Sequence, residues 1–136
     1  MKLLNGTVQH GYGVAGQNLR HVMSLIETRM GLSPLVEGTL NVKLAESYIV
    51  CAHALIEAHE YNLNNEYIKL QRCRLRGLQT IIMRPSTHEL GFAHGPAHLE
   101  LMATVKLRDH LHLSDGDAVR VEVEGNEEWW RGLSGS

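Results

Sequence analysis

The sequence predicts a mainly β fold, a six-stranded β-barrel that carries one main helix. Three observations support this expectation. Short apolar segments with alternating polar residues recur along the chain, turn-forming residues separate them, and only residues 18–30 place apolar side chains at helical spacing. With 136 residues, the chain has the length of one domain. We place this domain at residues 1–128 and expect residues 129–136 to form a C-terminal tail.

The N-terminal elements follow from glycine content and apolar spacing. Met1 leads directly into a strand-like segment, and three glycines within residues 11–16 predict a loop. The apolar residues of the next segment share one helical face: Leu19, Val22, Met23, Ile26 and Met30. We expect Asn18 to cap this helix and Gly31 to end it.

Residues 39–44 leave a turn and alternate between polar and apolar side chains, which predicts a short strand. Because successive side chains of a strand point to opposite faces, Thr39, Asn41 and Lys43 are expected on one face. Residues 47–59 are ambiguous, since their first part favours a strand and their second part accepts a helix. We favour a strand.

The second half of the chain continues with β segments. Residues 68–70 and 80–83 are expected strands, and Pro85 is expected to stop the second of them. Residues 86–98 contain two glycines, a proline and three histidines without periodicity, so they predict a long loop of the kind that carries function. Residues 99–102 resume as a strand.

The last part of the chain contains a strong turn signal, Asp-Gly-Asp, at residues 115–117. Residues 119–123 then alternate between valine and charged residues, which predicts a strand with one solvated face. Trp129 and Trp130 are expected to cover an edge or end of the barrel, and residues 132–136 to fray.

Composition limits the partners of the protein. The formal net charge is −2, which gives no general reason to expect nucleic-acid or membrane binding. Cys51 and Cys73 are too far apart for a CxxC motif, so free thiols in a reducing cytoplasm are expected. Because the chain has no excess of basic residues, any phosphate binding must come from a few polar or cationic groups at specific positions.

Two segments go beyond composition. Residues 38–44 read Gly-Thr-Leu-Asn-Val-Lys-Leu, and residues 99–108 are followed by Leu-Ser-Asp-Gly-Asp at 113–117. In sequence, order and spacing, these segments resemble motifs of the archaeal CTP-dependent riboflavin kinases. The resemblance as a whole extends over residues 6–123. The resemblance implies a cradle-loop (RIFT-like) β-barrel that transfers the γ-phosphoryl group of CTP to the riboflavin 5′-hydroxyl and so produces FMN and CDP.

The resemblance also implies roles for individual residues. Thr39 and Asn41 match the family's Mg²⁺ ligands, and a hydroxyl and an amide oxygen suit this cation. Thr87 and Glu100 match residues that hold the flavin, and Glu100 is also a candidate to accept the hydroxyl proton. Nucleotide binding is implied for two segments: His10, Gly11, Tyr12, Gly13, Val14 and Ala15, and Val105, Lys106, Leu107 and Arg108. A monomer or small homo-oligomer is expected.

The chain departs from the family pattern at three places, one of which is Thr104, where the family usually has a proline. Residues 13–15 read Gly-Val-Ala where the family has Gly-Glu-Gly, and Ser86 replaces an arginine, for which Arg84, two residues earlier, is a candidate substitute. An alternative function is therefore a non-catalytic flavin- or nucleotide-binding protein.

A second alternative rests on histidines. His88, His94 and His98 lie in one predicted loop close to Glu100, which fits a zinc or iron site of a metal-dependent enzyme. Their spacing matches no fixed zinc signature, and surface or loop-packing histidines explain the same residues.

Overall fold

The computed structural model of the protein describes residues 1–10, 19–61, 66–89 and 95–133. Within these ranges the strands are β1 (Lys2–Gln9), β2 (Leu40–Leu44), β3 (Ala54–Ile56), β4 (Ile68–Leu75), β5 (Leu78–Pro85), β6 (His98–Met102) and β7 (Ala118–Val123). The helices are α1 (Leu19–Met30), α2 (Ser86–Glu89), α3 (Leu107–His110) and α4 (Glu127–Arg131), with a 3₁₀ turn, η1 (Ala58–Glu60). None of the described helices is long and apolar enough to cross a membrane.

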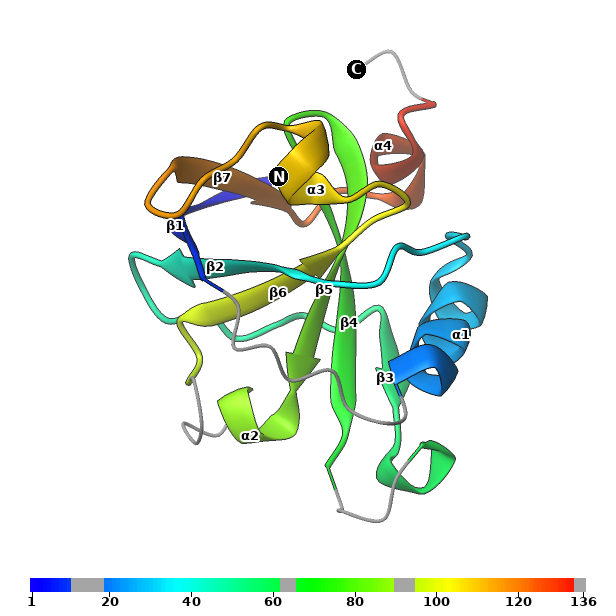
Figure 1. Ribbon diagram of the computed structural model, residues 1–136. Coiled ribbons are helices and arrows are strands. Elements are labelled where there is room, and N and C mark those ends of the chain that lie inside the picture. Colours follow the sequence, from blue (N-terminus) through cyan, green and yellow to red (C-terminus); the bar gives the residue numbers. More distant parts are fainter. Residues whose placement is uncertain (11–18, 62–65, 90–94, 134–136) are drawn as a thin grey trace.

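Six strands close into an antiparallel barrel in the order β4-β5-β6-β2-β1-β7, and β7 returns to pair with β4 (Figure 1). One edge of β4 serves two partners: its first residues pair with β3 and residues 73–75 pair with β7. The predicted six-stranded barrel is confirmed, and β3 is an additional strand beside it.

The barrel interior is filled by every second residue of its strands. In β7, Val119, Val121 and Val123 are buried while Arg120 is exposed, as the alternation predicts. The same pattern holds in β2, where Leu40, Val42 and Leu44 join the interior cluster. Burial of these aliphatic side chains stabilises the fold by roughly 1.5–3 kcal/mol each.

A second apolar cluster lies outside the barrel, where α1 packs beside β3 and β4 (Figure 1). Val22, Met23 and Ile26 are buried there, which confirms the predicted apolar face of the helix. Gly31 follows α1 with φ 65°, and its N–H donates to the Glu27 carbonyl at 2.9 Å, so it ends the helix as expected. The predicted cap, Asn18, lies outside the described residues.

The expected strand over residues 47–59 is wrong for most of its length. Only β3 is extended in a sheet, and η1 follows it. The Tyr48 N–H donates to the Pro96 carbonyl at 3.0 Å, and the Tyr48 carbonyl accepts from Arg84 at 2.8 Å. Because these loop and side-chain partners occupy its backbone groups, Tyr48 is not part of a strand ladder.

Two other boundaries differ from the prediction. The expected loop at residues 86–98 begins with α2 and ends inside β6, and its residues 90–94 lie outside the described part. The segment expected as a tail from residue 129 begins inside α4, whose N-cap Asn126 accepts from the Trp129 N–H at 2.8 Å. Trp130 is 1% exposed in the second apolar cluster.

β1 and β2 approach each other closely at Gly6. A Cβ atom at this position would lie 2.6 Å from the backbone oxygen of Lys43. We therefore expect Gly6→Ala to lower the free energy of unfolding by about 1–3 kcal/mol, because the strands must separate to admit the methyl group. Urea unfolding measures the change, with Asn5→Ala on the exposed side of β1 as control. Equal stability of the two variants would contradict the close approach.

Candidate functional site

Four neighbouring strands place a row of residues across the outer face of the barrel. Gln9 of β1 pairs with Asn41 of β2, Asn41 pairs with Glu100 of β6, and Glu100 pairs with Met83 of β5. Residues next to them in sequence, such as Val42 and Leu99, point into the barrel interior, so this row faces outward. Adjacent strands are about 4.8 Å apart. The row therefore brings the end of β1 close to the strand that carries Glu100.

Asn41 is the centre of this row and is only 7% exposed. Its Oδ1 lies 2.8 Å from Nε2 of His98, which is also buried. Thr39 is half-buried and directly precedes β2. A ring N–H that donates to Oδ1 leaves this oxygen a further lone pair. The amide oxygen of Asn41 and the hydroxyl of Thr39 thus fit a hard cation such as Mg²⁺, which takes oxygen ligands and keeps several waters.

The predicted histidine site is only partly within the described chain. His98 contacts Asn41, His88 belongs to α2, and His94 lies outside the described residues. Among the residues that the structure describes, no group of three or more His, Cys, Asp or Glu side chains is arranged to hold a metal ion. A metal site built from all three histidines stays a prediction.

Thr87, one of the two residues expected to hold the flavin, is hydrogen-bonded to Glu66. Oγ1 of Thr87 donates to Oε1 of Glu66 at 2.6 Å, and the Thr87 N–H lies 3.4 Å from the same oxygen. The negative charge of Glu66 also contributes to the raised pKa of Glu100. No sequence motif marks Glu66. The pairing of Ile68 with Pro85 brings the start of β4 beside α2, and this pairing is a tertiary property.

Glu100 is mostly buried, and its environment favours the protonated form. Burial, with a smaller contribution from the charge of Glu66, raises the pKa of Glu100 to about 7. A carboxyl group with a pKa near neutrality can both accept and release a proton at physiological pH. This property agrees with the proton-accepting role implied for Glu100.

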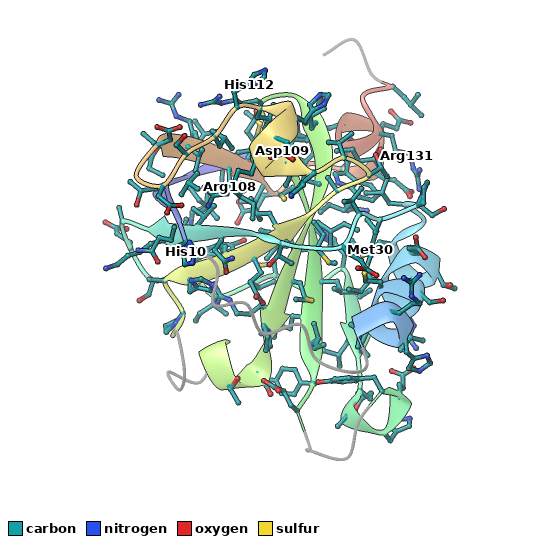
Figure 2. The ribbon with its side chains drawn as sticks, viewed as in Figure 1. His10, Met30, Arg108, Asp109, His112 and Arg131 are labelled. Carbon is teal, nitrogen blue, oxygen red and sulfur yellow. The ribbon has the colours of Figure 1, made fainter. Side chains whose placement is uncertain are left out.

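The two predicted nucleotide segments also meet. Nη2 of Arg108 donates to the Gln9 carbonyl at 3.0 Å and pairs with Oδ1 of Asp115 at 2.8 Å. Nδ1 of His10 lies 3.8 Å from Oδ2 of the same Asp115. Figure 2 shows Arg108 on α3 and His10 at the end of β1. Residues 11–15 of the predicted nucleotide loop lie outside the described residues.

Asp115 belongs to the turn predicted at residues 115–117, and the structure gives it a second role as the link between these segments. The turn is attached to β1, since the Gly116 N–H donates to the Val8 carbonyl at 2.7 Å and the Val8 N–H donates to the Asp117 carbonyl at 2.8 Å. An open hollow beside α3 is lined by Arg108, Asp109, His112, Leu113, Ser114 and Asp115.

The remaining residues of the second nucleotide segment differ in accessibility. Leu107 is buried in the interior cluster and Val105 packs against it. Lys106 is exposed, with Nζ 3.6 Å from Asp109. The side chain of Leu107 is therefore not accessible to a ligand, whereas Lys106 and Arg108 have cationic groups at the surface.

Arg84 does not replace the family arginine at position 86. It is fully buried, and its guanidinium donates to the Tyr48 carbonyl at 2.8 Å and to the Pro96 carbonyl at 3.0 Å. The side chain therefore holds two loop segments together inside the fold. The suggestion that it reaches the flavin side of the site is wrong.

The known proteins to which this chain is similar include riboflavin kinases. Residues 8–123 match the family model of the CTP-dependent riboflavin kinases, described as domain of unknown function DUF120. The chain is similar to a riboflavin kinase of Pyrococcus abyssi, with 33% identity over 125 residues, covering 87% of this chain and 57% of the relative.

Two further riboflavin kinases show comparable similarity. The protein of Methanocella arvoryzae is 32% identical over 99 residues, 71% of this chain and 44% of the relative. The protein of Pyrobaculum arsenaticum is 34% identical over 122 residues, 83% of this chain and 55% of the relative. The chain thus spans about half the length of these relatives.

Proposed function

This chain belongs to the CTP-dependent riboflavin kinase family, and we propose that it transfers the γ-phosphoryl group of CTP to the 5′-hydroxyl of riboflavin, giving FMN and CDP. The observation that carries the proposal is the outward row formed by Gln9, Asn41 and Glu100. It aligns the residue that precedes the first nucleotide segment, the cation-binding motif and the flavin side of the site on adjacent strands.

This order suits an in-line transfer, in which donor and acceptor must lie on opposite sides of the phosphoryl group. CTP binds at the His10 and Arg108 end, where the guanidinium offsets phosphate charge. Riboflavin binds at the Thr87 and Glu100 end. Thr39 and Asn41 would hold Mg²⁺, which would neutralise phosphate charge. Most of the rate enhancement then comes from positioning and electrostatics.

Glu100 has two tasks in this proposal. It holds the flavin, and its carboxylate accepts the proton of the 5′-hydroxyl as the new bond to phosphorus forms. Its raised pKa of about 7 supports this assignment, because the proton is then held and released close to neutral pH.

The proposal is tested by incubating the protein with riboflavin, Mg²⁺ and each of CTP, ATP, GTP and UTP, and by separating FMN from riboflavin by chromatography. We expect FMN with CTP alone. Formation with another donor instead would overturn the CTP assignment, and absence of FMN with every donor would overturn the kinase assignment.

Substitution of Asn41 tests the cation-binding motif. We expect Asn41→Ala to lower kcat/KM at least about tenfold, because an oxygen ligand next to the phosphate is lost. A higher Mg²⁺ concentration is expected to restore part of the activity. Thr7→Ala, on an exposed position of β1, serves as control, and thermal unfolding of both variants verifies that they are folded. Full activity of Asn41→Ala would contradict the metal assignment.

One observation favours the non-catalytic alternative. Ser86 stands where the family has an arginine, and the buried Arg84 does not take its place. Equilibrium binding of riboflavin or CTP without FMN formation would identify the chain as a binding protein with this barrel.

A further inference from the structure

The hydrogen-bonding polarity of Thr87 is set by Glu66. A threonine hydroxyl has one hydrogen to donate and two lone pairs to accept, whereas a carboxylate only accepts. Oγ1 of Thr87 lies 2.6 Å from Oε1 of Glu66, a short distance that is typical of a charge-assisted O–H···O⁻ bond. The hydroxyl hydrogen is therefore committed to Glu66, and the oxygen of Thr87 keeps its lone pairs for another partner.

The backbone around this pair is fixed on both sides. The Ser86 N–H donates to the Tyr67 carbonyl at 2.9 Å, which ties the start of α2 to the residue after Glu66. The Tyr61 hydroxyl donates to the Glu66 carbonyl at 2.7 Å. These bonds hold the backbone of Glu66 beside the start of α2, so the exposed side-chain hydrogen bond between Glu66 and Thr87 joins two segments that are tied together.

We propose that Glu66 is a positioning residue of the flavin site: it takes the hydroxyl hydrogen of Thr87, so that the Thr87 oxygen accepts a hydrogen bond from riboflavin. This inference rests on the proposed function, since it assumes that Thr87 contacts the flavin. Riboflavin offers two kinds of donor, the imide N–H of its ring and the hydroxyls of its ribityl chain. Either kind of donor could form the hydrogen bond to the Thr87 oxygen, and the proposal is that one of them does.

The inference predicts a specific pattern of riboflavin affinities, measured by the change of flavin fluorescence in the absence of nucleotide and Mg²⁺. Glu66→Ala and Thr87→Val are each expected to raise the Kd roughly tenfold, because a binding hydrogen bond is lost or misdirected. Glu66→Gln is expected to stay within about threefold of the wild type, because its amide oxygen still accepts from Thr87. Glu46→Ala, an exposed glutamate elsewhere, is the control.

A double variant separates positioning from a merely structural role. If Glu66 acts through Thr87, then Glu66→Ala adds nothing to the Kd of Thr87→Val, whereas independent effects multiply. The KM for riboflavin is expected to rise in Glu66→Ala while the KM for CTP stays unchanged. Thermal unfolding of each variant accompanies the titrations, so that a loss of folded protein is not counted as a loss of affinity.

Two flavin analogues identify the donor. 3-Methylriboflavin lacks the imide N–H, and lumiflavin lacks the ribityl hydroxyls. The analogue whose affinity does not change on Thr87→Val is the one that has lost the donor to Thr87. If Thr87→Val weakens both analogues as strongly as riboflavin, the inference is overturned.

The remaining outcomes distinguish this inference from the function on which it rests. Wild-type binding of riboflavin with an unchanged Kd in Glu66→Ala, or multiplying effects in the double variant, would overturn the role of Glu66 and leave the flavin-binding proposal intact. No binding of riboflavin by the wild type would overturn both.

Discussion

Replacing Trp130 with alanine is expected to lower the free energy of unfolding by about 3–5 kcal/mol, although the residue lies six positions from the C-terminus of the chain. The indole is 1% exposed and belongs to the apolar cluster between α1 and the barrel. Its Nε1–H donates to the Thr80 carbonyl at 2.8 Å. Alanine would leave a large cavity and remove the partner of a buried carbonyl, and both effects are destabilising.

Chemical denaturation with urea measures this loss. Trp130→Phe retains most of the apolar volume but not the hydrogen bond, so a smaller loss of about 1–2 kcal/mol is expected. Leu133→Ala is the control, because Leu133 is 75% exposed and its truncation is expected to change stability by less than about 0.5 kcal/mol. If Trp130→Ala were as stable as this control, α4 would not be part of the packed fold.

Replacing Glu100 with glutamine is expected to stabilise the protein at alkaline pH by up to about 3 kcal/mol. The folded state raises the pKa of Glu100 from 4.5 to about 7, so it favours the protonated form. Below pH 4.5 the carboxyl is protonated in both states and the raised pKa has no effect. As the pH rises through the window from 4.5 to 7, ionisation is disfavoured in the folded state and stability is lost. Residual solvent contact of Glu100 makes the 3 kcal/mol an upper value.

Urea unfolding at pH 4.5 and pH 8 tests this prediction. The wild type is expected to lose stability relative to Glu100→Gln between these values, with the two proteins similar at the lower pH, because glutamine is neutral throughout. Glu46→Gln, at an exposed position, is expected to follow the wild type. If the difference in unfolding free energy between wild type and Glu100→Gln were the same at the two pH values, the fold would not raise the pKa of the Glu100 carboxyl.

Much of the barrel could be predicted from the sequence because its determinants are local. Alternation of valine and charged residues identified β7, and the turn before it follows from Asp-Gly-Asp. The spacing of Val22, Met23 and Ile26 identified α1. Between Ser47 and His53 the local pattern failed, because Tyr48 takes its hydrogen bonds from loop and side-chain partners far away in sequence.

Some residues of the candidate site could likewise be predicted from the sequence, and others could not. Asn41, Thr87 and Glu100 belong to motifs that resemble a known family, so the chain could be searched for them residue by residue. Glu66 belongs to no such motif. Asp115 lies in the motif at residues 113–117, but its contact with Arg108, like that of Glu66 with Thr87, is visible only in the tertiary structure. Side chains that act through a neighbour on another element leave no signature in local sequence.

By itself, the sequence determined the barrel, its main helix and the segments that carry the candidate ligands, since alternation, turn residues and motifs are properties of short stretches. The tertiary structure alone decided which of these groups meet. The strand register aligns Gln9, Asn41 and Glu100, and burial raises the pKa of Glu100. Arg84 is buried inside the fold and does not reach the site. Register, burial and long-range hydrogen bonds depend on residues distant in sequence, which is the physical reason that they had to be observed in the fold.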